Sequence, residues 1–284
     1  MNTALGPTHD PAWLAHLLDD PGRLHAVPAG PLSLALLDNL ASSDPHLRDA
    51  LSLTLLDRLI ESDRLATPDR ERLAAAAIDE AHLGAGLGHT GDDRVFARSF
   101  GVLVVAALVE HDRDRQELVA STVGRLADAV LTYAACERDF RGYIPGQGWA
   151  HAAAHTADAL GCLAAHPAVP ASMVPVILQR IRELASVPVP LGFLEDDRLA
   201  LAAYRIMRLG KVPDDAVTTW LDGFNLPPDE TDAGSGTVMG SNQEHFLRSL
   251  YFRWLRADAL SPWLSRIQTA VARFDCYGAA VQDD

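Results

Sequence analysis

The sequence has few cysteines, a single lysine and no long apolar run. Its three cysteines are widely spaced and form no Cys-x-x-Cys pair. An odd number at wide spacing argues against a disulfide framework and favours a reducing compartment. The longest apolar stretch, residues 101–109, has about half the length that a membrane-spanning helix needs. The first residues contain neither a basic region nor an apolar run, so we expect no secretory signal, no membrane association and a cytoplasmic location.

Positive charge is also scarce. Lysine and arginine together number 24 against 38 acidic residues, which gives a formal net charge of −14. Because an acidic chain repels phosphate backbones, this balance argues against nucleic-acid binding. The length of 284 residues and the hydrophobic fraction of 48% exclude a disordered chain and suffice for a sizeable core.

Apolar residues recur at helical spacing along most of the chain. Leu32, Leu36 and Leu40, for example, share one helix face. Capping residues followed by proline, in Asp44-Pro45 and Thr67-Pro68, mark helix starts. The predicted helices span residues 11–19, 31–42, 45–62, 68–83, 93–111, 115–136, 148–166, 171–186, 194–209, 213–222, 241–257 and 261–276.

Short turns join consecutive helices, and helix pairs recur at intervals of roughly 40 residues. The sequence therefore predicts an all-α fold of stacked antiparallel helical hairpins, a HEAT- or armadillo-like α-solenoid forming one domain over residues 1–284. An irregular helical bundle is the alternative. Two segments interrupt the helices: a loop at 138–147 and an acidic stretch at 226–240, interpreted as a long loop with a mobile lid as the alternative.

Common nucleotide-binding and catalytic motifs are either absent from the sequence or lie in the wrong structural context. The segment Gly86-Leu-Gly-His-Thr-Gly91 matches Gly-x-Gly-x-x-Gly, but it follows a helical pattern where a dinucleotide site needs a strand. We therefore predict a loop there. The chain also contains no Gly-x-Ser-x-Gly and no His-Glu-x-x-His sequence.

One histidine-rich segment is more informative. In Gly148-Trp-Ala-His151-Ala-Ala-Ala-His155-Thr-Ala-Asp158, the two histidines are four residues apart and share a helix face. Such a pair can bind one divalent metal ion, such as zinc, iron or manganese, or one substrate. Asp158 would orient His155 or pair with an arginine. The expected third metal ligand is one of Glu137, Asp139, Glu195 and Asp196. The structural alternative is a buried polar network that holds the helices in register.

Five separated blocks resemble the bacterial family known as domain of unknown function 2785. They begin at Asp93, Glu137, Gly148, Leu194 and Phe246, and together they span about residues 90–255 in the family's order. The block around Trp149 is the specific one. The resemblance implies an all-helical fold and a shared set of polar positions, and it implies no activity.

These blocks define the candidate ligand-binding residues. We expect them to meet in one cleft, because equivalent helices of stacked hairpins line a common surface. They are Arg98, Asp139, Arg141, Trp149, His151, His155, Asp158, Glu195, Arg248 and Tyr251. Each also has a structural interpretation as an inter-helix salt bridge, a helix cap or a core anchor.

Two functions remain open from the sequence. The first is a non-catalytic helical-repeat protein that binds a partner protein or a small molecule in the cleft. The second is a metal-dependent hydrolase, in which His151 and His155 hold the metal, Asp139 or Glu195 acts as ligand or base, and Arg141 stabilises an anionic intermediate. The first is slightly favoured because no complete catalytic signature is present.

Overall fold

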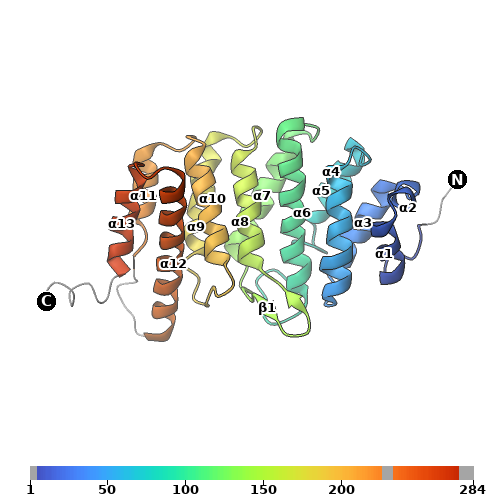
Figure 1. Ribbon diagram of the computed structural model, residues 1–284, viewed down its shortest axis with the longest axis horizontal. Helices are drawn as coiled ribbons and strands as arrows, with labels where there is room; N and C mark the ends of the chain where they lie inside the picture. Colours follow the sequence, from blue (N-terminus) through green and yellow to red (C-terminus); the bar gives the residue numbers. More distant parts are fainter. Residues whose placement is uncertain (1–4, 226–232, 275–284) are drawn as a thin grey trace, which may run out of the picture. The chain divides into compact units, whose positions relative to one another are not determined.

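The computed structural model describes residues 5–225 and 233–274 and is mostly helical (Figure 1). One two-stranded sheet accompanies the helices, so the all-α prediction is confirmed as a fold class. None of the described helices combines the length and the apolarity that crossing a membrane requires. The chain divides into two compact units, Met1–Val169 and Pro170–Asp284. The prediction of a single domain stays a prediction.

The first unit contains eight of the helices labelled in Figure 1 and the small sheet. Its long helices α6 (Arg94–Arg115) and α8 (Ala152–Ala165) pack closely because α8 presents a buried face of alanines, including Ala153 and Ala157. Gly101 lets α6 approach the end of α5, since a Cβ there would lie 3.1 Å from the carbonyl oxygen of Ala77. The elements are α1 (Pro11–Asp19), α2 (Pro21–Ala26), α3 (Ala29–Asn39), the π-helical η1 (His46–Leu53), α4 (Thr54–Glu61), α5 (Thr67–Ala77), α6 (Arg94–Arg115), α7 (Ala120–Cys136), β1 (Tyr143–Ile144), β2 (Gly148–Trp149) and α8 (Ala152–Ala165).

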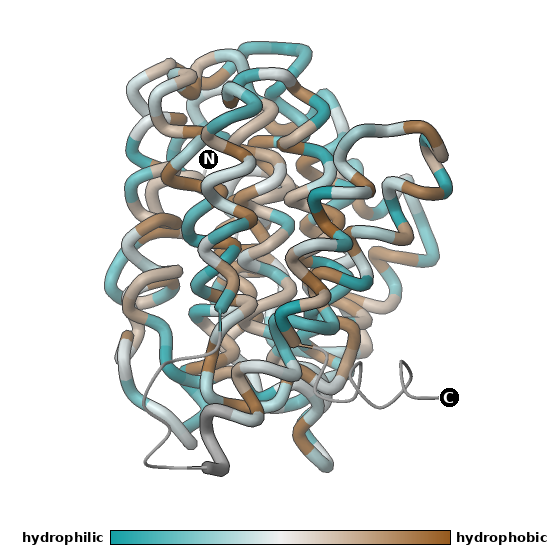
Figure 2. The backbone as a smooth tube through the Cα atoms, turned by 90° about the vertical axis from the view of Figure 1, so that its left-hand side faces the viewer, coloured by the Kyte–Doolittle hydropathy of each residue, from teal (hydrophilic) through white to brown (hydrophobic). Residues whose placement is uncertain are grey.

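The second unit is built around the packing of α10 (Glu195–Arg208) against α12 (Ala233–Ala257). Aromatic rings fill its core: the ring of Phe224 stacks on Phe246 at 5.3 Å and meets Trp220 edge-on at 5.2 Å. The elements are the 3-10 turn η2 (Ala171–Met173), α9 (Val174–Leu184), α10 (Glu195–Arg208), α11 (Asp214–Asp222), α12 (Ala233–Ala257), α13 (Trp263–Val271) and the 3-10 turn η3 (Ala272–Phe274). The backbone tube in Figure 2 shows polar and apolar residues alternating along the helices, as expected when each helix buries one face.

Several predicted boundaries were wrong. The helix predicted at 148–166 begins only at Ala152, because Gly148 and Trp149 pair with the preceding strand. The helix predicted at 68–83 ends at Ala77 and is followed by turns. The stretch predicted as a loop at 226–240 is helical from Ala233 onward, and residues 226–232 lie outside the described part.

The helix-start signals had mixed outcomes. Asp44 caps as predicted, since its Oδ1 accepts the backbone N–H of His46 at 2.9 Å. The predicted cap at Thr67 was wrong, because Thr67 already belongs to α5 and its side chain makes no capping hydrogen bond. Pro68 alone sets the start of that helix, through its fixed φ. The short helix α2 was not predicted.

Candidate functional site

Three aromatic side chains gather at the start of α8. The antiparallel strands place Tyr143 opposite Trp149, and their rings meet at 4.9 Å between centroids and 70° between planes. The imidazole of His151 stacks on the Trp149 indole at 4.3 Å and 23°. We call these three residues the aromatic stack. Tyr143 and Trp149 are 49% and 39% exposed, so a ligand in solution can reach this group.

His151 holds an unusual backbone conformation. It precedes the first residue of α8 with φ 48° and ψ 35°, the left-handed region that few residues other than glycine adopt. Its N–H donates to the carbonyl of Arg141 at 3.2 Å, and the N–H of Ala150 donates to Gly142 at 2.8 Å. These bonds extend the β-hairpin and hold the histidine in place. A conformation of this kind costs about 1–3 kcal/mol and is found preferentially at functional sites.

A buried arginine supports the hairpin. Arg48 has a fully buried side chain, and its Nη2 donates to the carbonyl of Gln147 and to Oδ2 of Asp49, both at 2.8 Å. The guanidinium lies 4.0 Å from the centroid of the Phe96 ring. Gly148 is required at this point, because its φ is 81° and a Cβ would lie 3.1 Å from Nη2 of Arg48. Sequence reasoning missed Arg48.

The carboxylate of Asp49 borders the same hairpin. Its Oδ2 lies 3.7 Å from the position that a Cβ on Gly148 would take. Burial raises the pKa of Asp49 above its ordinary value, against the opposing influence of Arg48 and the smaller one of His151. An acidic group therefore stands beside the aromatic stack.

His155 lies one turn into α8 and is almost fully buried. Its Nδ1 is 3.1 Å from the carbonyl oxygen of Ser99, and because a carbonyl can only accept, Nδ1 carries the proton and donates. Its ring meets Phe100 edge-on at 5.1 Å and lies 6.0 Å from the ring of His151. The structure thus brings the two predicted histidines together. Asp158 follows on α8, and its predicted role in orienting His155 stays a prediction.

The expected third metal ligands of the first unit are occupied by arginines. Within the described residues, no three histidine, cysteine, aspartate or glutamate side chains gather as a metal site would require. Glu137 forms two hydrogen bonds with Arg98, at 2.7 Å to Nε and 3.1 Å to Nη2. Metal binding by His151 and His155 stays a prediction, and Glu137 and Asp139 are not available as the third ligand.

The Arg98–Glu137 pair is a structural tie. Both side chains are buried, and Arg98 also donates to the carbonyls of Ala85 at 2.7 Å and Gly86 at 3.2 Å. Glu137 accepts the backbone N–H of Asp139 at 2.8 Å. The pair therefore holds the loop that follows α5 against the end of α7.

Asp139 and Arg141 fix the other end of that loop. Asp139 accepts from Arg141 Nε at 2.8 Å and from the backbone N–H of Gly91 at 2.9 Å. Burial opposes ionisation of this carboxyl, but the hydrogen bonds from Arg141 and Gly91 outweigh it and lower the pKa of Asp139. The Gly86–Gly91 motif is the loop that the sequence predicted, with positive φ at all three of its motif glycines.

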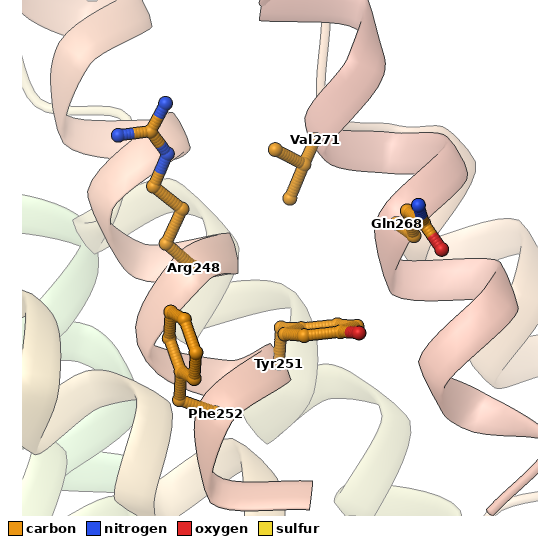
Figure 3. A pocket seen from close by; sticks show the side chains of 5 residues that line it. All are labelled: Arg248, Tyr251, Phe252, Gln268 and Val271. Carbon is orange, nitrogen blue, oxygen red and sulfur yellow. The ribbon is translucent and has the colours of Figure 1, made fainter. Parts of the chain in front are cut away.

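The remaining candidates belong to the second unit. Glu195 begins α10, and its buried carboxylate accepts the backbone N–H of Phe193 at 2.7 Å. Arg248 and Tyr251 lie on one face of α12 and border a pocket shared with α13 (Figure 3). The single cleft that the sequence predicts for all ten candidates stays a prediction.

A protein-family model matches residues 83–252, more than half of the chain. The family is described as protein of unknown function, DUF2785. This chain is a DUF2785 protein. The resemblance predicted over residues 90–255 is therefore confirmed. No match was found among curated proteins or among solved structures.

The DUF2785 match includes the candidate site residues but not the arginine that supports the hairpin. All ten candidate residues lie within it, from Arg98 to Tyr251. Arg48, which supports the hairpin of the aromatic stack, lies outside the matched range. Of the DUF2785 candidates in the first unit, Arg98, Asp139 and Arg141 form ion pairs within the fold, whereas Trp149 presents an exposed ring. The site therefore includes an accessible aromatic surface.

Proposed function

We propose that this DUF2785 protein is a non-catalytic binding protein whose first unit holds a small molecule with a flat ring at the aromatic stack. The observation that carries the proposal is the exposed Tyr143–Trp149 pair, with His151 stacked on the indole in a strained backbone conformation. Exposed aromatic faces held rigidly attract planar groups at a low entropic cost. Asp49 and Arg48 beside the hairpin pair with each other, so they offer no net charge to a ligand and favour one without charge.

The state of the nearby polar groups favours binding over catalysis. The guanidinium of Arg98, which could bind an anion, already donates its hydrogen bonds to Glu137 and to loop carbonyls. Asp139 and Arg141 neutralise each other. Neither arginine is therefore left to stabilise an anionic intermediate, which is the role that the hydrolase alternative gives to Arg141.

We also propose the HEAT-like stacking that the sequence predicts, and the packing within each unit supports it. The most extensive helix contacts join helices two apart in the chain, α6 with α8 and α10 with α12. This is the pattern expected when helical hairpins stack, because equivalent helices of neighbouring repeats become adjacent.

Thermal unfolding with a panel of uncharged and cationic heteroaromatic compounds tests the function. We expect compounds that raise the unfolding temperature of the wild type to lose this effect in Trp149→Ala. They should keep it in Leu260→Ala, which removes an exposed apolar side chain in the second unit. Without ligand, Trp149→Ala should cost about 2 kcal/mol, because much of the indole is buried although 39% of the residue is exposed.

Three results would count against the proposal. A loss of about 5 kcal/mol in unliganded Trp149→Ala would identify the indole as a core anchor. A panel that stabilises neither protein would contradict a flat-ring ligand. Zinc or manganese that stabilises the wild type but not a His151→Ala, His155→Ala variant would favour the hydrolase alternative.

A further inference from the structure

A pocket that differs chemically from the aromatic stack lies between α12 and α13. Its volume is about 200 Å³, and it is lined by Arg248, Tyr251, Phe252, Gln268 and Val271. The α12 residues follow one another at helical spacing of three and four, so they share a face, and the two α13 residues do the same. All five side chains border the space between the helices in Figure 3.

The polar groups stand at opposite ends of this pocket. Arg248 extends its guanidinium along α12 at one end, while the Tyr251 ring points toward α13, which carries Gln268, at the other (Figure 3). The Phe252 ring lies beside Tyr251 on α12, Val271 projects from α13 toward α12, and both supply apolar surface. Phe252 is 52% exposed although it is a large apolar residue, and its ring meets Tyr251 edge-on at 5.6 Å.

Arg248 keeps hydrogen-bonding capacity for a ligand. Its Nη2 lies 2.6 Å from Oε1 of Glu244, and its side chain is 58% exposed. A guanidinium carries five N–H donors, and one carboxylate uses at most two in a bidentate pair. Within the described residues, Glu244 is the acidic group paired with this arginine.

We propose that this pocket binds a small planar carboxylate, an aromatic acid of one ring. The carboxylate pairs with Arg248, the ring lies against Phe252 and Val271, and a hydroxyl on the far side of the ring bonds to Tyr251 or Gln268. The volume is below the roughly 300–1,000 Å³ of sites for drug-sized ligands, so it selects a small molecule. This site lies in the second unit and is independent of the aromatic stack.

Calorimetric titration of the full chain with 4-hydroxybenzoate tests the proposal. The uncharged analogue 4-hydroxybenzamide serves as the ligand control. Arg248→Gln removes the guanidinium, and Arg256→Gln removes an exposed arginine eight positions further along the same helix. We expect Arg248→Gln to weaken 4-hydroxybenzoate binding at least ten-fold and Arg256→Gln to leave it unchanged. The amide should bind at least ten-fold more weakly than the acid.

Each contrary result overturns the proposal. If 4-hydroxybenzoate does not bind the wild type, the pocket is not an aromatic-acid site. If Arg248→Gln and Arg256→Gln weaken binding equally, the attraction comes from the general charge of the protein. If Phe252→Ala leaves the affinity unchanged, the ring does not lie in this pocket. Thermal unfolding of each variant checks that it is folded at the titration temperature.

Discussion

The two units differ in where they keep their charges. In the first, Arg98 and Glu137 form an ion pair with exposed fractions of 0% and 1%, and Asp112 and His166 form a second buried contact at 3.1 Å. In the second, the described ion pairs lie at the surface, as in Arg248 with Glu244. Buried pairs fix loops and helix ends, whereas surface pairs add little to stability and can exchange partners. Besides its surface pairs, the first unit therefore uses buried ion pairs as structural ties, whereas the described ion pairs of the second unit are accessible to solvent.

The largest expected effect comes from opening the buried pair. Glu137→Gln removes the negative charge and leaves the Arg98 guanidinium buried among backbone carbonyls. We expect a loss of about 3–5 kcal/mol in the free energy of unfolding, because an uncompensated buried charge is strongly destabilising. Urea denaturation followed by circular dichroism measures the loss.

The matched change in the second unit is Glu183→Gln, which removes the partner of Arg180 on the exposed side of α9. Here we expect a loss below about 1 kcal/mol. Equal losses in the two variants would remove the distinction between structural and surface charge.

A second, intermediate effect concerns a carboxyl of the first unit that has no described cationic partner. Asp57 on α4 has its pKa raised to about 6, mainly by burial and also by the nearby Glu61. Because this is above the unfolded value of 3.8, the folded state binds the proton more tightly, and stability falls as pH rises from about 4 through 6. Asp57 thus shows how much folding stability a partly buried carboxylate costs the first unit when no described cation is paired with it.

Asp57→Asn should therefore stabilise the protein at neutral pH by about 1–2 kcal/mol, and this gain should vanish below pH 4. The gain is smaller than the full pKa shift implies, because the carboxyl group is partly exposed. Urea denaturation of wild type and variant between pH 4 and pH 7.5 measures the difference. A gain that is constant over this range would show that Asp57 keeps an ordinary pKa, and that helix propensity accounts for the change.

The α8 region shows how far sequence reasoning reaches. Helical periodicity predicted α8 itself and the proximity of His151 and His155. It could not predict the hairpin that precedes α8, because the two short strands depend on positive φ at Gly146 and Gly148 and on pairing across the turn. The predicted helix over 148–166 was therefore wrong at its first turn, where the aromatic stack forms.

Arg48 illustrates a different gap. It contacts the hairpin from 99 residues away in the chain, and no local pattern reports such a contact. One signal was available: Arg48 lies three and seven residues before Leu51 and Leu55, on the apolar face of its helical segment. A charged residue on such a face needs a buried partner. The loop predicted at 138–147 and the family resemblance were sufficient to place the site, but not to identify this support.

The smallest expected effect on stability belongs to Glu244, and it is the most direct test of the second unit. Glu244→Gln breaks an exposed pair on α12, so we expect a change within about 0.5 kcal/mol in the free energy of unfolding. The same variant removes a carboxylate that competes for the Arg248 guanidinium. The affinity for 4-hydroxybenzoate should therefore rise several-fold by calorimetry. If stability instead falls as far as in Glu137→Gln, Glu244 is a structural tie like those of the first unit. An affinity that stays constant while stability is unchanged would mean that Arg248 is not the group that receives the carboxylate.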